Sequence, residues 1–142
     1  DRAAVALTVR VLAVDHGAAR IGLALSDPSG TVARPIAAIP GRPLEEAVAR
    51  IARLVDEHAV ERVVVGLPLT LRGERGEQAR RAERFAAALA RALAVSVELY
   101  DERFTTRLAE DRGGTAPADA RAAAVLLEGW LASHTSARAE GE

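Results

Sequence analysis

The stretch that decides the fold is Val11-Leu12-Ala13-Val14-Asp15-His16-Gly17-Ala18-Ala19-Arg20-Ile21-Gly22-Leu23-Ala24-Leu25-Ser26-Asp27. It joins two short apolar runs through a turn. The first run extends from Val9 to Val14 and ends at Asp15, and the second extends from Ile21 to Leu25. Gly17 lies between them, and glycine tolerates the positive φ that many turns need. This pattern predicts two consecutive strands joined by a tight turn.

A third extended run follows the second closely. Turn-forming residues occupy positions 26–30, and the run from Thr31 to Ile39 comes after them. Pro35 lies inside this run, and because proline cannot donate a ladder hydrogen bond, it favours an edge strand or a bend. We therefore expect three strands in an antiparallel meander.

The pattern then changes to alternating helices and strands. A helical period begins at Pro43, and a long helix is predicted from Gly73 to Ala94. The β-branched run at Arg62 to Gly66 suits a buried parallel strand. The remaining elements are a strand from Val95 ending at Asp101-Glu102, a short helix at Thr105 to Arg112 and a closing helix at Asp119 to Ser133.

The order β-β-β-α-β-α-β-α-α predicts an α/β fold with one mixed five-stranded sheet and helices on both faces. The first, fourth and fifth strands should lie adjacent, with their C-terminal ends at one edge, where ligands of open α/β sheets bind. We expect one domain over residues 1–133 and a disordered polar tail over residues 134–142.

Composition narrows the class of protein. The chain has 142 residues, no cysteine and a net charge of −1, and all of its 19 Lys and Arg residues are arginine. Without cysteine, disulfides and thiolate metal sites are excluded, and a reducing compartment is favoured. Residues 1–8 do not resemble a secretory signal, and no apolar run is long enough to span a bilayer. The expectation is a cytoplasmic protein with no membrane partner.

Three carboxylates are placed at the ends of predicted elements. Asp15 ends the first strand, Glu102 ends the fifth, and Asp119 begins the last helix. Each alone has an ordinary explanation as a turn, cap or surface acid. At one sheet edge, however, they would repel one another unless cations neutralise them. Oxygen donors without Cys or His suit Mg²⁺ or Mn²⁺, and two such ions can promote hydrolysis of a phosphodiester. Asp101 is also available, either as an accessory acid beside the metal ligands or as a substitute for one of them.

Several residues near these acids are candidates for substrate contacts. Arg20 could bind a phosphate or clamp the acids, and Arg103 flanks Glu102. Thr105 and Thr106 could support the loop or simply cap the next helix. The densest basic stretch includes Arg80 and Arg84, four residues apart on a helix. A salt-bridged solvent face is its ordinary interpretation, and a phosphate grip is the alternative.

Four sequence blocks resemble the YqgF/RuvX family. The first is the stretch quoted above, and the others are Val63-Val64-Val65-Gly66-Leu67-Pro68 with Gly73, Leu99-Tyr100-Asp101-Glu102-Arg103-Phe104-Thr105-Thr106, and Asp119-Ala120-Arg121-Ala122-Ala123-Ala124-Val125-Leu126-Leu127. They occur in the family order and span nearly the whole chain. Thr70 stands where many relatives carry Asn. Any single block is weak evidence, but four together are specific.

The resemblance implies a ribonuclease-H-like fold and a divalent-metal nuclease with Asp15, Glu102 and Asp119 as its acidic triad. It implies a nuclease that matures the 5′ end of pre-16S rRNA in ribosome biogenesis. Some members are described as Holliday junction resolvases, so four-way junction DNA is the alternative substrate. The chain would act as a monomer, or as a homodimer if it placed two sites on a two-fold junction.

Two other functional classes compete with the nuclease. A phosphotransferase related to sugar kinases also ends its first strand in Asp-x-Gly, but it needs two lobes, for which 142 residues are too few. A non-catalytic nucleic-acid-binding factor in ribosome assembly would have no need of the acids. Cleavage of labelled rRNA and junction DNA discriminates between these hypotheses.

Overall fold

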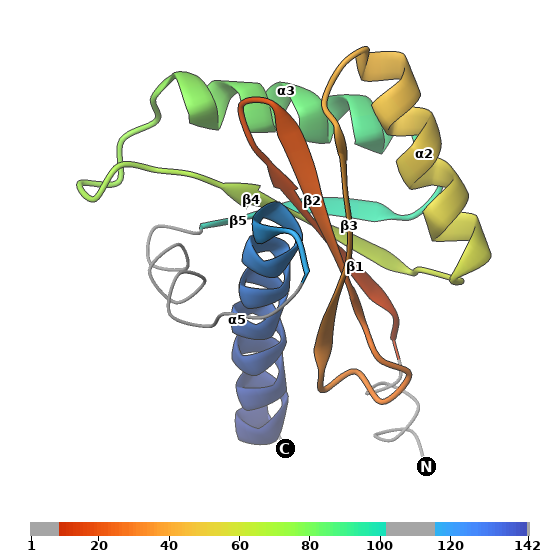
Figure 1. The fold of residues 1–142 in the computed structure, drawn as a ribbon. Coiled ribbons are helices and arrows are strands. Elements are labelled where there is room, and N and C mark those ends of the chain that lie inside the picture. The colour runs from red at the N-terminus through yellow and green to blue at the C-terminus, as the bar shows by residue number, and fades with distance from the viewer. Residues whose placement is uncertain (1–8, 102–115, 142) are drawn as a thin grey trace.

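The computed structural model describes residues 9–101 and 116–141, and Figure 1 shows the arrangement of its elements. One five-stranded sheet forms the centre of the molecule. Two helices cover one face of this sheet, and a third covers the other face. The elements are β1 (Val11–His16), β2 (Arg20–Ser26), β3 (Ala33–Pro40), α2 (Leu44–Glu57), β4 (Arg62–Leu67), α3 (Glu77–Ala92), β5 (Ser96–Asp101) and α5 (Ala118–Gly141).

The sheet has the predicted mixed topology. Its strand order is β3-β2-β1-β4-β5. The first three strands pair antiparallel, and β4 pairs parallel with both β1 and β5. The carboxyl ends of β1, β4 and β5 therefore meet at one edge. The expectations of a meander, and of adjacent first, fourth and fifth strands, are both confirmed.

Pro35 lies on the edge strand β3, as its chemistry predicts. Leu23 pairs with Ala37 but Ala24 pairs with Pro35, so one extra residue of β3 forms a bulge there. A bulge interrupts the ladder where proline has no N–H to donate. The proline thus occupies the strand position at which its missing hydrogen bond costs least.

The two sheet faces bury separate cores, which follow from the period-two alternation of strand side chains. Leu12 and Val14 of β1 point toward α2 and α3, where Phe85 and Leu89 are buried. Residues 11 and 13 point the other way, toward α5. The α5 core contains Ala123, Ala124, Leu126, Leu127, Trp130 and Leu131. Residues that are apolar on both faces are what a central strand between two helical layers requires.

The turn between β2 and β3 is built around one aspartate. Asp27 Oδ1 accepts hydrogen bonds from the backbone N–H groups of Thr31 and Val32, both at 3.0 Å. Gly30 adopts a φ of 75°, which favours glycine. A hydrogen bond from Ser29, together with the backbone donors, lowers the pKa of Asp27 to about 2. The turn predicted over residues 26–30 is confirmed.

Helix α3 begins later than predicted. The sequence period suggested a start at Gly73, but the helix begins at Glu77. Gly73 instead has a φ of 84° and donates its N–H to Thr70 O at 2.8 Å, while Thr70 Oγ1 accepts from Glu74 N at 3.0 Å. A hydrogen-bonded turn therefore occupies the segment that helical spacing assigned to the helix. The Thr70 hydroxyl has a local role in this turn.

The last helix is longer than predicted. We expected it to end at Ser133 and residues 134–142 to form a disordered polar tail, but α5 continues to Gly141. The His134 ring stacks on Trp130 at 3.7 Å, and its Nδ1 lies 2.8 Å from Trp130 O. These contacts lie within the helix at its first residue past the predicted end. The short helix expected at Thr105 to Arg112 lies outside the described residues. Within the described ranges, no helix is both long enough and apolar enough to cross a membrane.

Candidate active site

The candidate site is centred on Asp15, near the carboxyl end of β1. Strand alternation places Asp15 on the same face as Val11 and Ala13, which is the face that α5 covers. Asp15 pairs with Gly22 across the antiparallel ladder to β2. The carboxylate is therefore held by a central strand, beneath the first turn of the closing helix.

Gly22 allows that helix to approach the sheet. A Cβ atom at position 22 would lie 1.9 Å from Asp119 O and 2.3 Å from Asp119 C. Only glycine leaves space for the backbone of α5 at this point. Gly22 lies inside the apolar run that predicts the second strand, and a glycine inside a strand is the sequence signal of a close backbone approach.

The structure thus brings two of the three predicted acids together. Asp119 lies in the first turn of α5, where a negative charge is favoured by the helix dipole. Its Oδ1 would lie 3.7 Å from a Cβ built on Gly17, which fixes its position over the β1–β2 turn. Asp15 lies on β1, the strand that leads into that turn, and the charge of Asp119 affects its pKa.

The two carboxylates interact electrostatically. Burial, and secondarily the negative charge of Asp119, raise the pKa of Asp15 from 3.8 to about 6. Among the residues that the structure describes, no arginine or histidine lies within ion-pair distance of either acid. The chain therefore holds two acids together without a cation of its own from the described segments.

This donor set fits a hard divalent cation. Carboxylate oxygens are the preferred ligands of Mg²⁺ and Mn²⁺, and a cation would offset the burial and the negative charge of Asp119 that together raise the pKa of Asp15. In residues 9–101 and 116–141, no group of three acids or histidines suited to a metal is found, because the site there consists of two acids. Glu102, the predicted third acid, lies outside the described residues.

Asp101 has a different orientation from the two site acids. It is the last residue of β5, and the preceding Tyr100 packs against the α5 core. Alternation therefore points Asp101 away from the α5 face, on which Asp15 lies. This favours Asp15 and Asp119 over Asp101 as partners in one site. Arg103, Thr105 and Thr106 lie outside the described residues.

Gly17 and Arg20 form the turn beside the acids. Gly17 donates its N–H to Arg20 O at 2.9 Å. The positive φ considered for Gly17 is absent, since the glycines with positive φ in the described ranges are Gly30 and Gly73. Glycine is needed at position 17 for another reason: a Cβ there would lie 2.7 Å from Arg20 O. Arg20 itself is exposed at the start of β2 and makes no ion pair with the described part of the chain.

His16 ties the site to helix α3. Its ring contacts Phe85 with a centroid separation of 4.8 Å, and its backbone oxygen accepts a hydrogen bond from Gln78 Nε2 at 3.3 Å. Burial, and more weakly the positive charge of Arg81, lower the pKa of His16. His16 lies on the opposite sheet face from Asp15, so it supports the strand rather than completing the acid pair.

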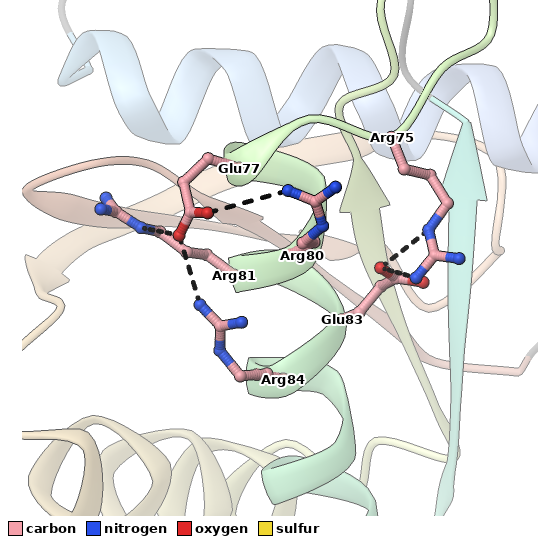
Figure 2. A network of polar contacts seen from close by, with 6 residues as sticks. All are labelled: Arg75, Glu77, Arg80, Arg81, Glu83 and Arg84. Carbon is pink, nitrogen blue, oxygen red and sulfur yellow. Dashed lines mark hydrogen bonds and ion pairs between the residues drawn. The ribbon is translucent and has the colours of Figure 1, made fainter.

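The basic stretch on α3 forms an ion-pair network, shown in Figure 2. The Glu77 carboxylate lies 3.3 Å from Arg81 Nε, 3.5 Å from Arg84 Nη2 and 4.0 Å from Arg80 Nη1. Arg75 pairs separately with Glu83, with Nη2 and Oε1 2.5 Å apart. Exposed pairs of this kind contribute about 0–1 kcal/mol each. The predicted salt-bridged face is therefore present, and Arg80 and Arg84 belong to it.

Comparison with solved structures gives the class of fold. RuvC of T. thermophilus, in complex with a Holliday junction substrate, superimposes with a TM-score of 0.63 at 16% identity, covering 89% of this chain and 96% of that one. The fowlpox virus Holliday junction resolvase gives a TM-score of 0.56 at 14% identity, covering 88% and 99%. The fold is therefore the ribonuclease-H-like α/β fold of these resolvases, as expected.

Sequence comparison gives the family. The RuvX family, described as "Holliday junction resolvase", matches residues 9–133. A protein of Chloroflexus aurantiacus named "Putative pre-16S rRNA nuclease" is 46% identical over 135 residues, covering 89% of this chain and 88% of its own. A protein of the same name from Anaeromyxobacter sp. (strain Fw109-5) is 47% identical over 132 residues, covering 87% and 96%. The chain belongs to the RuvX family, which confirms the resemblance drawn from the four sequence blocks.

Proposed function

We propose that this protein is a divalent-metal-dependent endonuclease that hydrolyses nucleic-acid phosphodiesters. The observation that carries the proposal is the pair of Asp15 and Asp119, held together by the contact of α5 with Gly22. Placing these acids together costs stability, because burial and the neighbouring charge of Asp119 disfavour the charged form of Asp15. An arrangement that is unfavourable for the fold and suited to a cation points to a functional role.

Asp15, Asp119 and, by the family resemblance, Glu102 would hold the ions. When bound, Mg²⁺ or Mn²⁺ supplies an activated water and stabilises the leaving oxygen of a phosphodiester, with two ions present on the substrate complex. The chain contributes the geometry. Strand β1 holds Asp15 and the start of α5 holds Asp119, while Gly22 on the neighbouring strand β2 leaves room for α5 to approach the sheet.

Precursor 16S rRNA is the substrate that the names of the relatives suggest. Proteins that are 46–47% identical over most of this chain carry the name "Putative pre-16S rRNA nuclease". We propose that the chain processes the 5′ end of this RNA during ribosome biogenesis, in the cytoplasm. Arg20, with Arg103 and Thr105 by resemblance, would contact the backbone of the substrate.

Four-way junction DNA is the second candidate substrate. The matching family is described as a Holliday junction resolvase, and the fold is shared with the resolvase RuvC. Resolution of a junction requires two cuts related by two-fold symmetry, which a homodimer would provide and a monomer would not. A homodimer in the presence of the substrate would therefore favour junction DNA over rRNA.

Cleavage assays decide between the two substrates. We expect labelled precursor rRNA to be cut near the mature 5′ end with Mg²⁺ or Mn²⁺, and four-way junction DNA to be cut more slowly. The Asp119→Asn variant should lose cleavage of whichever substrate wild type cuts. If wild type cuts neither substrate with any divalent ion while remaining folded, the nuclease proposal fails, and a non-catalytic assembly factor becomes the better interpretation.

Metal binding should also be measurable without substrate. A ligand that binds only the folded state at ten times its Kd raises the free energy of unfolding by about 1.4 kcal/mol. We expect millimolar Mn²⁺ at pH 7.5 to raise the melting temperature of wild type and to leave the Asp15→Asn variant nearly unchanged. Ca²⁺, which is larger but also prefers oxygen ligands, is the comparison ion. An equal shift in wild type and variant would show that the ion binds elsewhere.

A further inference from the structure

The two helices on one face of the sheet differ in charge. Helix α3 carries four arginines and two glutamates, a net of +2, whereas α2 carries two arginines and four acids, a net of −2. The whole chain has a net charge of −1. Positive charge is therefore concentrated on one of two neighbouring helices rather than spread evenly over that face.

The positive charge lies on the exposed side of α3. Arg80, Arg81 and Arg84 expose 57%, 41% and 65% of their side chains, and the buried side of the helix is formed by Ala79, Ala82, Phe85, Ala86 and Leu89. None of these arginines is needed to bury the core. Among the residues that the structure describes, the three guanidinium groups share a single counter-charge, the carboxylate of Glu77 (Figure 2).

Glu77 holds these arginines together without neutralising them. One carboxylate against three guanidinium groups leaves a local charge of +2. The contacts of 3.3–4.0 Å are longer than those of tight charge-assisted hydrogen bonds. Each guanidinium has five N–H donors, so the described part of the chain leaves most of their donors available to another anion. The carboxylate thus occupies a position that a phosphate group could take.

Helix α3 also adjoins the acid pair. Gln78, one residue after Glu77, donates to the backbone oxygen of His16, which directly follows Asp15. Phe85 contacts the His16 ring from the same helix. The basic face therefore begins near the carboxyl end of β1, while Asp15 and Asp119 lie on the other side of the sheet at that end.

We propose that Arg80, Arg81 and Arg84 form a backbone-binding surface for the nucleic-acid substrate, with Glu77 as an internal stand-in for a phosphate. The arginines contact phosphates on a part of the substrate beyond the scissile bond. They do not read base sequence, since phosphate contacts position a strand without specifying it. This inference rests on the proposed function for its substrate class, which is an RNA or DNA sugar-phosphate backbone.

The test measures binding without cleavage. The Asp15→Asn protein is titrated against fluorescein-labelled RNA duplex and four-way junction DNA over a series of salt concentrations. In this background we compare Arg80→Gln/Arg84→Gln with Arg50→Gln/Arg53→Gln. The second pair lies on exposed positions of α2 and changes the total charge by the same amount.

We expect the α3 double variant to bind roughly tenfold more weakly near 0.1 M salt and to lower the slope of log affinity against log salt by about two. The α2 variant should bind within about twofold of its parent, because its arginines lie outside the proposed surface. Glu77→Gln should bind more tightly, because it removes the competing carboxylate. The RNA and DNA arms show which backbone the surface prefers.

Equal losses in the two double variants would overturn the proposal, because only total charge would then matter. Weaker binding by Glu77→Gln would overturn the role of Glu77 as a phosphate stand-in. The outcome is separable from the proposed function. If wild type cleaves its substrate and the α3 double variant binds as tightly as its parent, only the proposed binding surface is refuted. If binding depends on the α3 arginines but wild type does not cleave, only the proposed nuclease function is refuted.

Discussion

The Asp15→Asn variant should lose cleavage and gain stability at the same time. Electrostatic support from bound ions is worth several kcal/mol in a phosphodiester hydrolysis, and each 1.36 kcal/mol is a factor of ten in rate. We therefore expect cleavage to fall roughly a thousandfold or more. Stability should rise because the substitution removes a partly buried negative charge next to Asp119.

The gain in stability should depend on pH. The folded-state pKa of Asp15, about 6, exceeds its ordinary value of 3.8, so the folded protein binds this proton more tightly than the unfolded chain. Wild type therefore loses stability as pH rises from about 4 through 6, by up to about 3 kcal/mol, and the variant does not. The two proteins should have similar stability near pH 4, and the variant should be more stable at pH 8.

Urea denaturation in EDTA at pH 4, 6 and 8 measures this difference. The fluorescence of Trp130, the only tryptophan, reports the unfolding of α5, where its side chain is 4% exposed. Asp56→Asn, at an exposed position on α2, is the control for a simple change of charge. A variant that is less stable than wild type at pH 8 would contradict the raised pKa assigned to Asp15. Unchanged cleavage would remove Asp15 from the site.

The Gly22→Ala variant should disrupt the packing of α5 on the sheet. The new methyl group would lie 1.9 Å from Asp119 O, and both groups belong to backbone that regular structure holds in place. Overpacking of this kind costs about 1–3 kcal/mol and occasionally more, and here no flexible side chain can move aside. We expect a loss of about 3 kcal/mol in the free energy of unfolding. Cleavage should also fall, because Asp119 moves with the helix.

The matched control is Gly76→Ala, at the N-cap of α3. A Cβ at Gly76 has no neighbouring atom within 4 Å, and the residue has a φ of −91° that any residue adopts. This change should alter stability by less than about 1 kcal/mol. Urea unfolding of both variants, with Mn²⁺-induced stabilisation of each, separates loss of the fold from loss of the acid pair. If Gly22→Ala is as stable as Gly76→Ala, the close approach of α5 is not as described.

Most of the sheet could be predicted from local pattern. Alternation and turn chemistry at residues 11–27 specify a hairpin, and the β-branched run Val63-Val64-Val65 specifies a buried strand, because these preferences act over a few neighbouring residues. Helix ends were less predictable. Thr70 forms a turn through hydrogen bonds with Gly73 and Glu74, and side-chain periodicity does not report such bonds.

The sequence by itself determined the family, the mixed sheet and the choice of Asp15 and Asp119 among many acids. Only the tertiary structure decided that these two carboxylates interact, because they are far apart in the chain and meet only when α5 packs on β2. The tertiary structure also explains why position 22 requires glycine, and it shows that Asp101 points away from the α5 face. The physical reason is that the charge, the burial and the free space around a residue depend on segments that are distant in the sequence. Local sequence patterns do not show which of these segments come into contact.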